Sequence, residues 1–152
     1  MASFKDRKGN IWDVELVYTT LKRLKDRLGL DVGKLVADEL KPLVELYNDP
    51  CRMVEVLYVM CEDQIRQRNM SDEDFGRLFD GDTIAAGVEA WESSLITFFQ
   101  KSNPMLKKVF DKAKQVTEKS HKLIEAKLDS LSVDEIIAKA QHQKSSAKNS
   151  NE

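Results

Sequence analysis

The chain has 152 residues, of which 41% are hydrophobic and 33% are charged, and it contains six Gly, three Pro and two Cys. This composition favours one helical domain with an extension over a turn-rich β protein, and it excludes a membrane span because no apolar run approaches the ~20 residues that a span needs. The formal net charge of −2 hides an asymmetry, because residues 1–100 carry 13 Lys and Arg against 19 Asp and Glu, whereas residues 101–152 carry 11 against 7.

The first ten residues, MASFKDRKGN, contain no apolar segment, so we expect no signal peptide. Cys51 and Cys61 fit a reduced cytosolic protein. In one helix these two thiols lie ~15 Å apart, which is too far for a disulfide. We therefore expect a cytoplasmic protein.

Residues 3–16 predict a β-hairpin in which residues 3–6 and 11–16 pair across a four-residue turn. Gly9 and Asn10 in that turn tolerate positive φ angles. The second strand has one mostly apolar face, formed by Trp12, Val14 and Leu16. Because a lone hairpin is marginal in water, we expect this face to lie on helices.

The hairpin is followed by helical patterns. Residues 17–29 predict a helix that ends at Gly29, and short helical turns follow until Pro42 forces a break or a new start. Asp49 is the expected N-cap of a long helix at 49–69. The inward side of this helix is expected to carry Val54, Leu57, Tyr58, Cys61 and Ile65.

Residues 71–79 predict a short helix, and residues 83–100 predict a long helix at the centre of the core. The long helix repeats apolar residues at spacings of four and three, which is typical of one buried face. These residues are Ile84, Val88, Trp91, Leu95 and Phe98, with Ile96 and Phe99 widening the stripe.

The sequence Ser102-Asn103-Pro104 marks a boundary in the middle of the chain. Asn103 can cap a helix from 104 to about 131. The apolar stripe of this helix is interrupted by small and polar residues, and includes Leu106, Val109, Val116 and Leu123. We expect a weaker amphipathic helix here than at 83–100.

Ten of the eleven aromatic residues precede position 101, and Phe110 is the exception. A last short helix is expected at 133–142, where Ser132 and Glu135 form a capping box. Together these patterns predict a mainly α fold, with an N-terminal β-hairpin packed on a compact helical bundle and a long C-terminal helical arm. The expected parts are a core domain at 1–100, a lysine-rich helical arm at 101–143 and a disordered tail at 144–152.

The sequence lacks the motifs typical of catalysis. It contains no phosphate-binding glycine pattern and no nucleophile elbow. The two cysteines and two histidines match no zinc spacing, and Cys61 on an inward stripe is expected to be a small buried hydrophobe. We therefore expect a protein that is not an enzyme and has no catalytic residues, no cofactor and no metal.

The acidic stretch SDEDFGRLFDGD at 71–82 needs its own explanation. As a calcium loop it fails, because neither register that begins at an aspartate places glycine at the sixth position. Helix capping explains it better: Ser71 caps one helix, Gly81 turns the chain, and Asp82 caps the next helix. Whether the outer carboxylates also meet a basic partner stays open, so we treat Asp72, Glu73 and Asp74 as candidate partner-binding residues.

The basic arm has three possible partners. Its basic residues are all lysines and it has a single aromatic residue, which argues against nucleic acid. It lacks the bulky apolar face of a membrane-surface helix. A protein partner, self-association or contact with the acidic core domain fits best. The candidate partner-binding residues of the arm are Leu106, Val109, Phe110, Val116 and Leu123.

Several segments resemble small proteins that are encoded beside the tail genes of phages and prophages. FKDRKGNIWDVEL resembles their hairpin pattern F-x-D-x-x-G-x-x-W, and the next helix ends in Gly-Leu-Asp, as theirs do. The resemblance continues through NDPCRMVEVLYVMCEDQ and SDEDFGRLFDGDTIAAGVEAWESSLITFF, and covers about residues 3–100. These proteins are tail assembly chaperones of long-tailed phages.

The resemblance implies a small, mostly helical, non-enzymatic protein of the bacterial host cytoplasm that binds the tape measure protein before the tail tube forms. A tape measure is a long helical chain with apolar stripes, which a chaperone would cover by helix-in-groove packing. The resemblance assigns no single residue as a contact. Two alternatives stay open: a structural tail component that is retained in the virion, and a helical adaptor module of the host.

Overall fold

The computed structural model of the chain describes residues 2–130, 135 and 137–141. The chain divides into two compact units, Met1–Asp111 and Lys112–Glu152. The first unit, which we call the body, is mainly helical and carries a two-stranded antiparallel N-terminal hairpin packed on helices, which confirms the predicted fold class. The described part of the second unit, which we call the arm, is helical.

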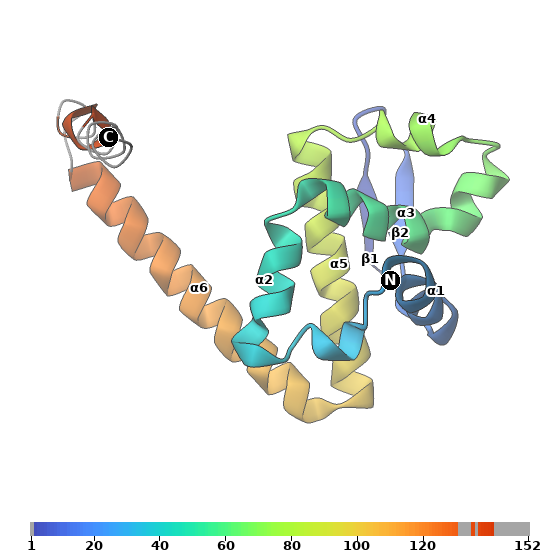
Figure 1. The fold of residues 1–152 in the computed structure, drawn as a ribbon, viewed down its shortest axis with the longest axis horizontal. Coiled ribbons are helices and arrows are strands. Elements are labelled where there is room, and N and C mark those ends of the chain that lie inside the picture. The colour runs from blue at the N-terminus through green and yellow to red at the C-terminus, as the bar shows by residue number, and fades with distance from the viewer. Residues whose placement is uncertain (1, 131–134, 136, 142–152) are drawn as a thin grey trace, which may run out of the picture. The chain divides into compact units, whose positions relative to one another are not determined.

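Figure 1 labels the elements in chain order. They are β1 (Ala2–Lys5), β2 (Ile11–Val14), α1 (Tyr18–Leu28), α2 (Lys41–Tyr47), α3 (Pro50–Gln67), α4 (Asp72–Gly76), α5 (Gly81–Ser102) and α6 (Pro104–Ser130), with short 3-10 turns at Val32–Lys34 and Asp38–Leu40. The predicted start of a last helix at Ser132 and the predicted tail at 144–152 lie outside the described residues, whereas residues 137–141 are helical.

The hairpin is held by one buried carboxylate. Strand β1 pairs with β2 so that Phe4 lies opposite Trp12. Asp6 accepts hydrogen bonds from the Trp12 indole at 2.8 Å, from the Lys8 and Asn10 amides at 2.8 and 3.0 Å, and from the Asn10 side chain at 2.8 Å. Gly9 has the expected positive φ of 89°, but Asn10 does not have one, which corrects that prediction.

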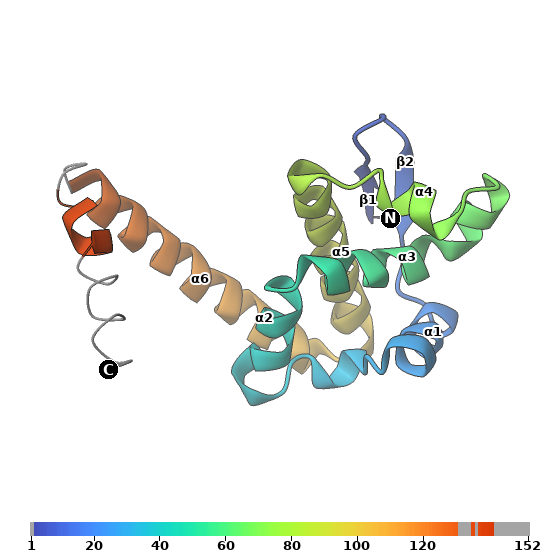
Figure 2. The ribbon, with the colours of Figure 1, turned by 45° about the horizontal axis from the view of Figure 1, so that its top comes forward.

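The body's core forms where the hairpin meets α3, α4 and α5. Trp12, Val14 and Leu16 are buried, as the strand alternation predicts. The Trp12 ring meets Phe75 of α4 edge-on at 5.0 Å. Strand β1 lies beside α5, and α3 crosses α5 steeply (Figures 1 and 2). A Cβ on Gly87 of α5 would overlap the buried Leu57 of α3, so the two helices approach closely there.

Helices α1 and α3 are joined by an ion cluster around Glu62, a buried acid of α3. Its carboxylate accepts hydrogen bonds from Arg27 at 2.7 Å and from Arg66 at 2.8 Å, and Arg23 lies 3.6 Å away. Burial alone would raise the pKa of Glu62, but the arginines outweigh it and lower the pKa. The cluster therefore fixes α1 on one side of α3.

The start of α5 differs from the prediction. Asp80, not Asp82, is the N-cap, because its Oδ1 accepts a hydrogen bond from the Thr83 amide at 2.9 Å. Gly81 is the first residue of the helix and has no positive φ, so it does not turn the chain. The preceding helix α4 is also shorter than the predicted 71–79.

The buried face of α5 is rotated from the predicted stripe. Trp91, Leu95 and Phe99 are buried as expected, but Ile84, Val88, Ile96 and Phe98 are only half-buried. The small residues Gly87, Ala90 and Ser94 are buried instead, and Gly87 lies where α3 approaches α5 closely. Ser94 donates a hydrogen bond to the Val14 carbonyl at 2.6 Å.

Candidate functional site

Three helices of the body border an open apolar groove, which we call the α3 groove. Its volume is about 340 Å³, and it is lined by Arg27 and Leu28 of α1, Val54, Glu55, Tyr58 and Val59 of α3, and Asp72, Phe75 and Gly76 of α4. Val59 and Phe75 are buried beneath it. Val54 and Tyr58 were expected to face the core, but they are half-buried and line this groove, which corrects the prediction for that stripe.

The short helix α4 lies along the groove because both of its ends are fixed. Ser71 caps it as predicted, accepting a hydrogen bond from the Asp74 amide at 3.1 Å and donating one to the Asp74 carboxylate at 2.8 Å. Phe75 anchors its inner side between Trp12 and Tyr58, at ring distances of 5.0 and 5.7 Å. The acidic first turn therefore stays on the outside.

The groove has a polar rim whose charges differ in how they are paired. Arg27 is bound to Glu62, which raises the pKa of the Arg27 guanidinium. Asp72 accepts a hydrogen bond from the Tyr58 hydroxyl at 2.6 Å, and this bond raises the Tyr58 pKa. Glu55 is exposed and paired with Arg52 at 3.2 Å. Among the lining residues, the two acids Glu55 and Asp72 outnumber the single base, Arg27.

The three candidate acids of α4 therefore have different surroundings. All three are exposed in its first turn, where they oppose the positive end of the helix dipole. Asp72 lines the groove, Glu73 pairs with Arg77 at 2.6 Å, and Asp74 is bonded to Ser71. Only Asp72 of the three combines a place in the first helical turn with a place beside an apolar surface.

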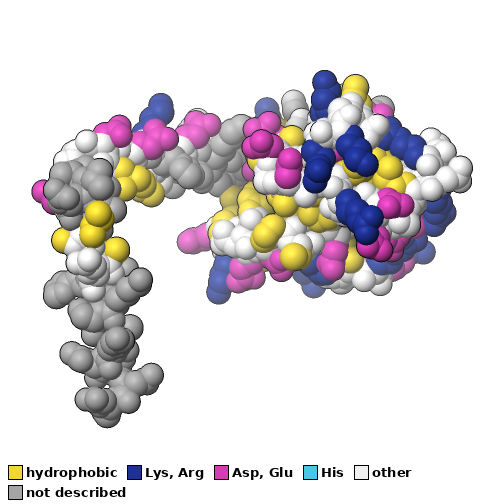
Figure 3. All heavy atoms as spheres, turned by 90° about the horizontal axis from the view of Figure 1, so that it is seen from above, with side chains coloured by type: hydrophobic (Ala, Val, Ile, Leu, Met, Phe, Trp, Pro, Cys, Tyr) yellow, Lys and Arg dark blue, Asp and Glu magenta, His cyan; other side chains and the backbone are white. Residues whose placement is uncertain are grey.

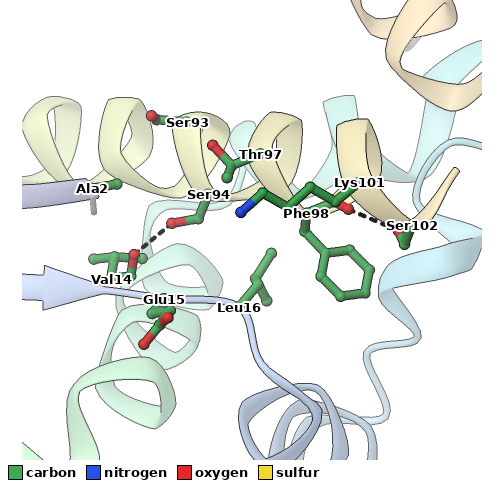
Figure 4. A pocket seen from close by; sticks show the side chains of 10 residues that line it. All are labelled: Ala2, Val14, Glu15, Leu16, Ser93, Ser94, Thr97, Phe98, Lys101 and Ser102. Carbon is green, nitrogen blue, oxygen red and sulfur yellow. Dashed lines mark hydrogen bonds between the residues drawn. The ribbon is translucent and has the colours of Figure 1, made fainter. Parts of the chain in front are cut away.

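A second hollow, of about 690 Å³, lies between the hairpin and α5 (Figure 4). Ala2, Val14, Glu15 and Leu16 form one wall, and Ser93, Ser94, Thr97, Phe98, Lys101 and Ser102 form the other. The Ser94 and Ser102 hydroxyls donate to the carbonyls of Val14 and Phe98. Lys101 and Glu15 bring opposite charges to this hollow. The lining residues include no histidine, so the hollow contains no Ser–His pair, and the hydroxyls of Ser94 and Ser102 are engaged with backbone carbonyls.

The candidate residues of the arm fall into two groups. At the start of α6, Leu106 is half-buried and Val109 is exposed. Phe110 is buried against Phe99, with ring centroids 5.7 Å apart. Phe110 therefore belongs to the core of the body and is not free to bind a partner. Leu123 lies exposed in the arm, and Val116 is not among the side chains that the structure describes.

Beside the candidate Leu123, which is 66% exposed, the arm carries two exposed apolar residues that were not singled out as candidates. Ile124 and Leu128 are 56% and 51% exposed. Figure 3 shows hydrophobic side chains breaking the charged surface of both the body and the described part of the arm. Helix neighbours three and four positions apart share a face, so Ile124 and Leu128 form an apolar row with Leu123 at its edge.

Among the described residues, the Cys61 thiol and the side chains that could ligate a metal bear on possible chemistry. Burial raises the pKa of the Cys61 thiol to about 12, so it remains protonated at neutral pH, as expected for a buried hydrophobe. Within the described residues, no three or more His, Cys, Asp or Glu side chains are grouped so that they could hold a metal ion. No helix in the same part of the chain is both long and apolar enough to cross a membrane.

No protein-family model, no curated protein and no solved structure matches this chain. Sequence reasoning missed Leu28, Val54, Glu55 and Tyr58 as groove residues. The sequence held only an indirect signal for the groove. The apolar face of α3 with Val54 and Tyr58 carries the acid Glu55 beside it, and the next helix begins with the acid Asp72.

Proposed function

We propose that this protein is a non-enzymatic tail assembly chaperone, which binds the tape measure protein of a long-tailed phage or prophage-like particle in the α3 groove. The observation that carries this proposal is the open apolar groove with an acidic rim, built from helices that are fixed by Glu62 and Phe75. The resemblance of residues 3–100 to such chaperones supplies the class of client. The site of action is the cytoplasm of the bacterial host.

The mechanism is physical. A client helix lays two or three apolar side chains onto Val54, Tyr58 and Leu28, and basic residues beside its stripe meet Glu55 and Asp72. The body is pre-organised, because the groove walls are fixed by hydrogen bonds and ring contacts that exist without a client. A groove of this size holds only a short helical segment, so many copies are needed to cover one long tape measure.

Co-expression with a candidate tape measure protein tests the proposal. The wild-type chain should co-purify with the tape measure and raise its soluble fraction. The substitution Val54→Asp places a charge on the groove surface and should reduce co-purification about tenfold or more, the effect of losing a contact worth at least ~1.4 kcal/mol.

The matched control is Val44→Asp, which changes an exposed valine of α2 outside the groove. It should leave co-purification at the wild-type level. Both variants are first checked for an unchanged helical spectrum and melting temperature. Failure of the wild-type chain to bind or solubilise the tape measure would contradict the proposal, as would equal effects of the two substitutions.

Mass spectrometry of purified particles separates the chaperone from a structural tail component. An assembly chaperone is released when the tube subunits arrive, so it should be absent or rare in mature tails. Abundant protein in mature tails would contradict the chaperone proposal and favour a retained component.

A further inference from the structure

We propose that, before a client binds, the α3 groove of one copy is occupied by the arm of a second copy. This inference rests on the same groove as the proposed function, and it adds a partner, which is a second copy of this chain, and a contact surface on that partner. The contact surface is the apolar row formed by Leu123, Ile124 and Leu128 of α6.

The apolar row fits the groove in size and composition. The row presents three aliphatic side chains that are each more than half exposed, and the groove provides Leu28, Val54 and Tyr58 around a buried floor. At roughly 25 cal/mol per Å² of apolar surface removed from water, covering such residues is favourable wherever a complementary surface exists. Large contiguous apolar patches on a surface, unlike single scattered residues, mark contact surfaces.

Charge complementarity selects a second copy as the occupant. Residues 1–111 carry 16 Lys and Arg against 20 Asp and Glu, whereas residues 112–130 carry five Lys against three Asp and Glu. Lys119 and Lys127 each lie four residues from Leu123 and share its side of the helix, whereas Glu125 lies three residues before Leu128 at the other edge of the row. The groove is lined by two acids, Glu55 and Asp72, and by one base, Arg27, which is bound to Glu62.

The two surfaces therefore match in apolar composition and in charge. An apolar row with lysines beside it meets an apolar groove with carboxylates beside it. Opposite charges around an apolar contact fix its register and exclude wrong pairings more than they add affinity. When two copies exchange arms, each copy uses its groove and its row once, so the assembly closes as a two-fold dimer.

The same occupancy gives the groove a regulatory property. A bound arm covers the apolar groove until a client helix replaces it, so the free protein hides the surface that would otherwise aggregate. A client must then bind more tightly than the arm does, which excludes weakly matching helices.

The experiment measures the mass of the full-length chain by size-exclusion chromatography with light scattering over a concentration series. The wild-type mass should rise with concentration to twice that of the 17.4 kDa chain. A groove-reversed variant, Glu55→Lys with Asp72→Lys, should stay monomeric because its rim repels the arm lysines. An arm-reversed variant, Lys119→Glu with Lys127→Glu, should also stay monomeric, because its new glutamates are repelled by Glu55 and Asp72 of the groove.

Mixing the two variants makes the test specific. In a mixed dimer the arm lysines of the first variant meet the native acidic groove of the second, and the reversed arm meets the reversed groove. The mixture should therefore regain the dimer mass. The control Lys108→Glu with Lys122→Glu makes the same charge change, but Lys122 is two residues from Ile124 and faces away from the row, so this control should dimerise.

Three results would overturn the inference: a wild-type chain that stays monomeric at every concentration, a dimer that survives both reversals, or a mixture that fails to associate. An arm that folds back on its own body would give the first result. The outcome is independent of client binding, because a chain that dimerises in this way without binding a tape measure refutes only the proposed function.

Discussion

Helices α5 and α6 are the two longest helices of the chain, with 22 and 27 residues, and both have apolar stripes with a helical period. The stripe of α5 is covered: Trp91, Leu95 and Phe99 are buried in the body, where α5 contacts the hairpin and α3. In the arm part of α6, the apolar row at Leu123 and Ile124 is exposed. The same sequence period therefore has two different structural outcomes.

This difference shows what a helical period does and does not determine. The period identifies which side of a helix is apolar. Whether that side is covered depends on small residues that admit a neighbour, such as Gly87 and Ser94 in α5, and on elements elsewhere in the chain that reach it. An apolar side that the chain's own elements do not reach is available for a partner.

The largest expected effect compares one leucine from each helix. Leu95→Ala removes a fully buried side chain of α5 and should lower the free energy of unfolding by about 2–5 kcal/mol, because it leaves a cavity. Leu123→Ala removes an exposed side chain of α6 and should change the free energy of unfolding by less than about 0.5 kcal/mol under monomeric conditions. Urea unfolding measures both, and equal losses would show that the arm's row is covered within one chain.

The next effect concerns the close approach of α5 to α3. Gly87→Ala gains helix propensity, but its Cβ would overlap Cδ1 of the buried Leu57, so it should destabilise the body by about 1–3 kcal/mol. Gly81→Ala in the same helix has no heavy atom within 4 Å of the new Cβ and should be neutral or stabilising. If both substitutions had the same effect in thermal unfolding, the close packing of α3 on α5 would be wrong.

Much of the fold can be predicted from local patterns. The hairpin follows from strand alternation and Gly9, and α3 begins where Asp49 caps it and Pro50 takes the first helical position, with Asp49 accepting a hydrogen bond from the Arg52 amide. Gly29 ends α1 with a φ of 63°. These features depend on neighbours within a few residues, so the sequence determines them directly.

The candidate groove cannot be predicted in the same way. Val54 and Tyr58 look like core residues in the sequence, and only the positions of α1 and α4 show that they are left partly open. Glu62 looks like a surface residue, yet it is buried because arginines from α1 and α3 converge on it. Both outcomes depend on contacts between residues that are distant in sequence.

The last effect depends on pH and tests whether acid weakens the hairpin that lies beside α5. Asp6 holds the hairpin that lies beside α5. Burial would raise its pKa, but the hydrogen bonds from Trp12, Asn10 and Lys8 outweigh burial and lower the pKa below the unfolded value of about 3.9. Asp6 therefore stabilises the folded chain above that pH, and this contribution is lost as the pH falls through the lower folded pKa.

Asp6→Ala should lower the free energy of unfolding at neutral pH by about 1–3 kcal/mol, since the buried Trp12 indole loses its acceptor. The gap between wild type and variant should shrink as the pH falls towards about 2, because protonation removes the same charged acceptor from the wild type. Tryptophan fluorescence during urea unfolding at several pH values measures this gap. Glu89→Ala, which removes an exposed carboxylate of α5, serves as the control and should show a change of less than about 0.5 kcal/mol. If the difference in free energy of unfolding were equally large at every pH, Asp6 would stabilise the hairpin by packing rather than by its charge. Acid would then leave the packing of the hairpin on α5 unchanged.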